Sequence, residues 1–306
     1  MDKCRNARKL KYMRKITILI FTILCSYSLK SQDLLSMLDS IQPEVKQTQY
    51  EEGTFKSVRL INGYTSETAG KNNLIFSISH RFGNVNGGFH DFYGLDQSTI
   101  RFGFEYGIND RIDLGIGRSN FEDIYDGFIK IKLARQSTGK KRFPFTITWS
   151  EGLSVNTLEW TIPEIDYPLT ARFNYIHELF ITRKFNERLS LQLSPVIVHR
   201  NMVKTNEDQN TVSAIGAGGR YKITNRFTAV VEYYYLFPGK TAENYNNSLA
   251  LGVEIETGGH VFQIHVTNAT GMTEKAFIPE TNGKWLDGDI GIGFNIIRLF
   301  NLERKK

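Results

Sequence analysis

The sequence has 306 residues, with 38 basic and 32 acidic side chains and a formal net charge of +6. Eight of the basic residues and a single acid lie within residues 1–31, so the rest of the chain has 30 basic and 31 acidic side chains. The basic character therefore belongs to the first segment, which excludes a nucleic acid as a partner.

Residues 1–31 have the pattern of a secretory signal peptide. A basic run is followed by nine mostly apolar residues, 16–24, and then by small residues. An apolar stretch of that length is far below the roughly 20 residues that span a bilayer, which disfavours a membrane anchor. Cleavage fits after Ser28 or after Ser31, and translation could start at Met1 or Met13.

Both cysteines of the chain, Cys4 and Cys25, lie in this predicted signal peptide. The exported protein would therefore contain none. Disulfides, thiolate-ligated metals and thiol catalysis are excluded for it, and export to an oxidising compartment is tolerated.

Residues 32–70 are predicted to form an N-terminal periplasmic segment. Apolar side chains at helical spacing within residues 32–42 indicate a short amphipathic helix. Residues 54–62 leave three alternatives open: an extra strand, part of the periplasmic segment, or a plug that enters a barrel.

Residues 71–300 alternate between apolar and polar side chains with a period of two. In residues 100–107 every even position is apolar, and the odd positions are charged or glycine. One face of each strand therefore meets an apolar medium and the other meets water or polar groups. About twelve strands are expected, near residues 73–82, 98–107, 111–119, 125–135, 143–154, 171–184, 188–199, 211–223, 226–237, 247–256, 260–268 and 287–298.

The joints between these strands are short at one end and long at the other. Short turns are expected near 109–110, 137–139, 186–187, 224–225 and 257–259. Long loops are expected at 83–97, 155–170, 200–210, 238–246 and 269–286, and only the joint near 120–124 breaks the pattern. Such asymmetry is typical of outer-membrane barrels, with both chain ends on the periplasmic, short-turn side. The sequence thus predicts an all-β, antiparallel, up-and-down transmembrane β-barrel over residues 71–300, followed by a tail at 301–306.

The last predicted strand carries a second indication. Asp289, Gly291, Phe294 and Ile296 form the pattern polar-x-Gly-x-x-aromatic-x-apolar. This resembles the closing-strand signal that the outer-membrane barrel assembly machinery recognises. The machinery and outer-membrane lipid are therefore expected partners.

The inward faces of the strands would line the lumen. A barrel of about twelve strands lies between those filled by side chains, at about 8, and those with open channels, at about 16–18. The expected lining is mixed in charge, which fits either mutual neutralisation or a selective filter. The candidate lumen residues are Arg81, Arg101, Glu105, Lys130, Lys132, Glu178, Glu232, Glu254, Gln263 and His265.

No catalytic, cofactor-binding or metal-binding residue is predicted. The six histidines lack zinc spacing, and no diagnostic motif joins a serine to His177 or His265. The leading hypothesis is a porin-like or solute-specific channel with no cofactor. The alternatives are a non-transporting barrel that anchors a periplasmic protein partner through residues 32–70, and, less favoured, a membrane-embedded hydrolase.

Several runs in order give a family resemblance. The chain is similar to a family of Bacteroidetes β-barrel proteins known only as a domain of unknown function, over about residues 33–300 and most densely over 55–136. The resemblance implies an outer-membrane location and supplies no activity, ligand or catalytic residue. The runs that carry it are residues 59–63 (Arg-Leu-Ile-Asn-Gly), 79–83 (Ser-His-Arg-Phe-Gly), 92–96 (Phe-Tyr-Gly-Leu-Asp), 106–111 (Tyr-Gly-Ile-Asn-Asp-Arg), 115–119 (Gly-Ile-Gly-Arg-Ser) and 125–130 (Tyr-Asp-Gly-Phe-Ile-Lys).

Overall fold

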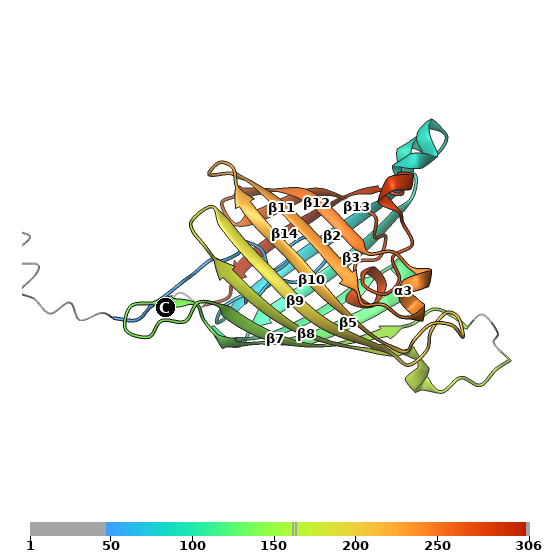
Figure 1. The fold of residues 1–306 in the computed structure, drawn as a ribbon, viewed down its shortest axis with the longest axis horizontal. Helices are drawn as coiled ribbons and strands as arrows, with labels where there is room; N and C mark the ends of the chain where they lie inside the picture. The colour runs from blue at the N-terminus through green and yellow to red at the C-terminus, as the bar shows by residue number, and fades with distance from the viewer. Residues whose placement is uncertain (1–46, 161, 163, 304–306) are drawn as a thin grey trace, which may run out of the picture. The chain divides into compact units, whose positions relative to one another are not determined.

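A closed antiparallel β-barrel of twelve strands forms the body of the structure (Figure 1). The computed structural model describes residues 47–160, 162 and 164–303, so the predicted signal peptide and the helix at 32–42 lie outside the described residues. Neighbours in sequence are neighbours in the barrel, and the last strand pairs with the first. The strands are β2 (Asn73–Asn84), β3 (Ser98–Gly107), β4 (Ile112–Ser119), β5 (Ile124–Ala134), β7 (Thr146–Asn156), β8 (Phe173–Lys184), β9 (Leu189–Arg200), β10 (Thr211–Lys222), β11 (Phe227–Leu236), β12 (Ser248–Thr257), β13 (His260–Thr267) and β14 (Gly291–Asn301).

The period-two sequence pattern sets which side chains face inward. On β3, Phe102 and Phe104 point outward and are 43% and 42% exposed, whereas Arg101 and Glu105 point inward and are 1% and 3% exposed. Closure leaves no strand edge without a partner, which a sheet in lipid requires because unpaired backbone groups there cost several kcal/mol. The predicted up-and-down barrel of about twelve strands is confirmed.

The two ends of the barrel differ as the sequence predicts. Short turns join β3 to β4, β8 to β9, β10 to β11 and β12 to β13 at the left of Figure 1. On the same side, β6 (Ser137–Thr138) in the β5–β7 turn pairs with β1 (Gln49–Tyr50). The opposite end carries the longer connections, which contain η1 (Val85–Gly94), η3 (Leu169–Arg172), α3 (Lys240–Asn244), α4 (Glu274–Phe277) and η4 (Trp285–Asp287). The β4–β5 joint holds only η2 (Phe121–Asp123). Among the described residues no helix is long and apolar enough to cross a membrane.

Strand β14 begins at Gly291, four residues later than the predicted start at 287. The helical turn η4 occupies residues 285–287 and ends at Gly288, whose φ of 77° is the left-handed conformation that glycine favours. The chain therefore turns once more before it enters the sheet, which periodicity alone does not indicate.

Candidate functional site

Residues 54–69, which we call the plug, lie inside the barrel. Most of their side chains are buried, and Ile61 has no exposed surface. The segment folds back on itself, since Leu60 N donates to Gly63 O at 2.9 Å and Thr65 N donates to Val58 O at 2.8 Å. Its partners come from strands all around the wall, which only a segment in the lumen can reach. The stretch 54–62, for which the sequence left three alternatives open, is thus placed within the barrel.

A single carboxylate holds the turn of the plug. The backbone N–H groups of Ile61, Asn62 and Gly63 donate to Glu232 of β11 at 3.2, 3.1 and 2.9 Å. Successive N–H groups that converge in this way form a concavity suited to an anion. A Cβ atom at Gly63 would lie 2.1 Å from Oη of Tyr234, so the close approach requires glycine.

Amide and guanidinium groups bind the carbonyls of the same turn. Nε2 of Gln263 donates to Leu60 O, and Nδ2 of Asn295 donates to Ile61 O, each at 2.9 Å. Nη2 of Arg81 donates to Oδ1 of the Asn62 side chain at 3.0 Å. Side chains of the wall thereby satisfy backbone groups that would otherwise be buried without partners.

The other side of the wall binds the second half of the plug. Nη2 of Arg101 donates to Oη of Tyr64 at 3.1 Å, and Nε2 of Gln192 donates to Tyr64 O at 2.8 Å. Nζ of Lys130 donates to Glu67 O at 2.9 Å.

The ten predicted lumen residues surround the plug. All are buried except Lys132, which is half-buried with Nζ 3.9 Å from Glu67. Arg81, Arg101, Lys130, Glu232 and Gln263 hydrogen-bond to the plug directly. Glu105 pairs with Lys130 at 3.1 Å, Glu178 accepts from Tyr234 Oη at 3.3 Å, and Glu254 accepts from Gln263 at 3.0 Å. The two ring nitrogens of His265 have no hydrogen-bond partner within the described part of the chain.

The histidines considered for serine–histidine chemistry are separated. His177 is exposed on the outward face of β8 and its Nδ1 lies 2.7 Å from Glu151, whereas His265 faces inward on β13. In the described residues no three His, Cys, Asp or Glu side chains gather as metal ligands.

The residues of the closing-strand motif lie at the seam of the barrel. Asp289 precedes β14, and Gly291, Phe294 and Ile296 belong to it. The Phe294 ring stacks on His80 of β2 with centroids 5.0 Å apart. The motif thus lies along the pairing of the last strand with the first.

A second segment fills the half of the lumen nearest the long loops. Residues 268–283 of the β13–β14 connection, which we call the outer loop, fold into the mouth and bury all of α4. Phe277 packs edge-on against Tyr234 at 5.2 Å. Its apolar surroundings come from the inward faces of β8–β11 and from the loop itself: Ile176, Val196, Val198, Val212, Ala214, Tyr234, Leu236, Ala269 and Ile278.

The sequence analysis did not identify this apolar packing. Strict alternation assigns only one apolar face to each strand, yet Val196 and Val198 face an apolar interior while Ile197 faces outward. The continuous run at 196–198 was the available signal, because a strand that is buried on both faces loses alternation.

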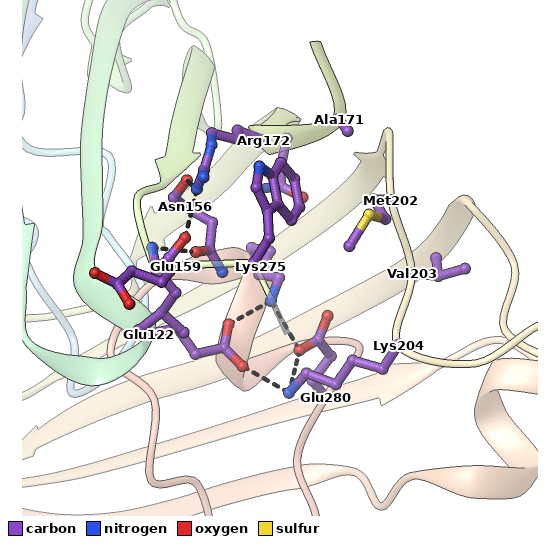
Figure 2. A pocket seen from close by; sticks show the side chains of 13 residues that line it. Glu122, Asn156, Glu159, Ala171, Arg172, Met202, Val203, Lys204, Lys275 and Glu280 are labelled. Carbon is purple, nitrogen blue, oxygen red and sulfur yellow. Dashed lines mark hydrogen bonds and ion pairs between the residues drawn. The ribbon is translucent and has the colours of Figure 1, made fainter. Parts of the chain in front are cut away.

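Ion pairs hold the outer loop at the mouth (Figure 2). Nζ of Lys275 lies 2.5 Å from Glu122 and 2.9 Å from Glu280, and Nζ of Lys204 lies 2.6 and 2.9 Å from the same two carboxylates. Arg200 Nη1 donates to the other oxygen of Glu280 at 2.9 Å. Burial opposes ionisation of Glu280, but Lys275 and Lys204 outweigh it and lower the pKa of this carboxyl. We call these five side chains the latch.

A pocket of about 180 Å³ opens above the latch (Figure 2). Trp160 and Met202 form part of its wall, and Lys275 and Glu280 lie at its base. Cζ of Arg172 lies 4.1 Å from the centre of the Trp160 ring, so this face of the indole is covered by a cation. The pocket is a vestibule that ends at the outer loop.

The plug and the outer loop both line one small space within the structure. A space of about 20 Å³, enough for one water molecule, is lined by Tyr64 of the plug and Glu274 of the outer loop together with Asp126 and Glu178 of the wall. In the described structure Oε1 of Glu274 has no hydrogen-bond partner. Polar side chains of the two segments therefore line the same small space.

Comparison with known proteins gives the family. Residues 55–300 match the family described as "Membrane bound beta barrel domain (DUF5777)". The chain belongs to this family. None of the curated proteins compared matches the sequence.

Solved structures similar to this membrane-bound barrel include porins. The NanC porin aligns with a TM-score of 0.46 and 10% identity over 74% of this chain and 98% of its own. The KdgM porin aligns with a TM-score of 0.42 and 9% identity over 76% and 99%. CdiB from Escherichia coli aligns with a TM-score of 0.35 and 9% identity over 85% of this chain and 68% of its own. The likeness is one of barrel architecture.

Membership in a membrane-bound family gives the two faces of the wall their environments. The outward apolar side chains meet lipid, and the inward polar ones meet the plug. Any solute that crossed this barrel would have to pass the plug and the outer loop, which block the lumen in series.

Proposed function

We propose that this protein is an outer-membrane barrel that passes small polar solutes through its lumen when the plug and the outer loop withdraw. The polar attachment of the plug carries the proposal. Its backbone is held by side chains such as Glu232, Gln263 and Asn295. Water can replace each of these hydrogen bonds at a net cost of only about 1 kcal/mol.

Withdrawal of the plug would leave a charged bore. Arg81, Arg101 and Lys130 would line it together with Glu105 and Glu232, all inward-facing residues of the wall. A bore with both signs of charge favours polar solutes over apolar ones and weakens any strong preference for one sign of ion.

Single-channel recording tests passage. The full chain in a planar bilayer is expected to conduct rarely. In two separate variants, residues 54–69 or residues 268–283 are replaced by a glycine–serine linker of equal length. Each variant is expected to open only somewhat more often than the full chain, because the plug and the outer loop block the lumen one after the other. The chain with both replacements is expected to conduct steadily. If that double variant shows no conductance while it remains a folded, heat-modifiable barrel, the proposed passage of solutes through the lumen is wrong.

A second candidate is a non-transporting barrel that anchors a periplasmic partner. The filling of both halves of the lumen favours it, and so does the small sheet of β1 and β6 at the short-turn end. The silent double variant would be its expected result.

The outer-membrane location rests on the short-turn and long-loop asymmetry, on the predicted signal peptide and on the closing-strand motif of β14. Phe294→Ala is expected to lower the amount of assembled barrel in cell envelopes several-fold, with less effect on refolding into detergent micelles. Phe300→Ala, an outward aromatic of the same strand beyond the motif, is the matched control. Equal loss in both assays, or equal loss in the control, would contradict recognition of Phe294 by the assembly machinery, and recovery of the wild-type chain in the soluble periplasm would overturn the location.

A further inference from the structure

An apolar groove of about 460 Å³ runs over the outward face of β8–β11 in the half nearest the short turns. It exists because two successive outward residues of β10, Ala217 and Gly219, are small and lie between the larger side chains of β9 and β11. Its walls are apolar or aromatic side chains: Phe145, Ile181, Phe185, Leu191, Leu193 and Val231.

Arg183 is the only charged residue that lines this groove. Its Cζ lies 4.9 Å from the Phe185 ring and 5.8 Å from the Phe145 ring, so two aromatic faces hold the guanidinium at the groove end. Within the described residues Arg183 makes no ion pair, and its buried Nε has no hydrogen-bond partner. A guanidinium presents donors in a planar fork that matches a phosphate.

The position of Arg183 along the strand sets its depth. It is the second-last residue of β8, next to the short turn, while the groove extends from it toward the middle of the barrel. Aromatic and basic side chains at strand ends lie at the level of lipid headgroups. Arg188, in the turn that follows β8, adds positive charge at the same end, and the acid of that turn, Glu187, is paired with Lys184 at 2.8 Å.

We propose that this groove holds an acyl chain of an anionic phospholipid from the leaflet at the short-turn end, with Arg183 paired to the lipid phosphate. The groove supplies apolar contact for the chain, and the arginine supplies the counter-charge for the headgroup. The proposal rests on membership in a membrane-bound family and is independent of passage through the lumen.

The half of the barrel nearest the long loops contains a groove that serves as a matched control. A second outward groove of about 540 Å³ is lined by Phe102, Phe104 and Ile116. Its basic residue, Arg118, is already paired with Asp123 at 2.9 Å. This groove offers a similar volume without a free cation, so it is expected to hold lipid with no preference for an anionic headgroup.

Native mass spectrometry of the full chain, released from micelles that contain equal amounts of phosphatidylglycerol and phosphatidylcholine, tests the site. Wild type is expected to retain one phosphatidylglycerol at least fivefold over phosphatidylcholine. Arg183→Gln is expected to abolish that preference, and Arg118→Gln is expected to leave it unchanged. Ala217→Leu, which fills the groove, is expected to lower retention of phosphatidylglycerol several-fold.

Three results would overturn the proposal: equal retention of both lipids by wild type, an unchanged preference in Arg183→Gln, or full retention in Ala217→Leu. Each variant is compared only as the folded, heat-modifiable form, so loss of folding is separated from loss of binding. An excess of inorganic phosphate is expected not to displace the lipid. Displacement would show a site for free anions instead.

Discussion

Glu232→Ala is expected to release the plug and to make it accessible to soluble reagents at least ten times faster than in the wild-type barrel. The substitution leaves three buried N–H groups, those of Ile61, Asn62 and Gly63, without their acceptor. Each unsatisfied buried donor costs about 1–3 kcal/mol, and about 1.4 kcal/mol already changes an equilibrium tenfold. The docked state loses this free energy while the withdrawn state, in water, does not.

Thiol labelling measures the release. Ser57, which is 3% exposed, is replaced by cysteine in a background where Cys4 and Cys25 are serine, and the rate of reaction with a charged maleimide is followed. Glu207→Ala, at an exposed loop carboxylate, is the control and is expected to leave the rate unchanged. Glu232→Gln keeps one acceptor oxygen and is expected to lie between the two. An unchanged labelling rate in Glu232→Ala would show that this carboxylate does not hold the plug.

The barrel wall could be predicted from the sequence because lipid and lumen impose opposite requirements on successive residues. Strand β3 was placed at its observed bounds, 98–107, and β10 was within one residue at 211–223. Turn-forming residues in the sequence predict the short joints between the strands. The late start of β14 was missed because the helical turn before it depends on Gly288 and on neighbouring loops rather than on periodicity.

The contents of the lumen were harder to predict for a physical reason. Parity along the strands predicts which wall residues point inward, but Lys130, Glu232 and Gln263 bind backbone groups of the plug, which any sequence possesses. Only close-approach glycines mark such docking in the sequence. A Cβ atom at Gly218 would lie 2.2 Å from Leu60 of the plug, yet glycines are frequent in these strands and this one did not stand out.

Different interactions hold the plug and the outer loop, so the two segments are expected to respond differently to substitution. The plug packs its apolar side chains in two small clusters against the wall, and its turn is held by hydrogen bonds from the backbone to single side chains such as Glu232. One substitution in the wall should therefore release this turn without loss of the barrel. The outer loop combines an apolar cluster around Phe277 with a compact set of ion pairs. Release of the outer loop is therefore expected to lower the stability of the barrel as well as to open its mouth.

Glu280→Ala is expected to free the outer loop and to lower the free energy of unfolding of the barrel by about 3–5 kcal/mol, the usual cost of removing one partner from a buried ion pair. Arg200 is fully buried and Glu280 is its only carboxylate partner among the described residues. Lys275 and Lys204 would retain Glu122 alone. Trypsin, which needs an accessible chain, is then expected to cleave after Lys275, a site that is 5% exposed in the intact protein.

Urea titration in micelles measures the stability, and the tryptic pattern reports the loop. Glu243→Ala, an exposed carboxylate of α3 at the same end of the barrel, is the control and should change neither. Glu280→Gln keeps the volume and a hydrogen-bond acceptor but not the charge, so it should fall between. If Glu280→Ala loses stability while Lys275 stays protected, the apolar cluster around Phe277 holds the loop without the latch. If Lys275 becomes accessible at nearly unchanged stability, the ion pairs keep the outer loop in place and do not stabilise the barrel. The cations of the latch would then have become hydrated when the loop moved away.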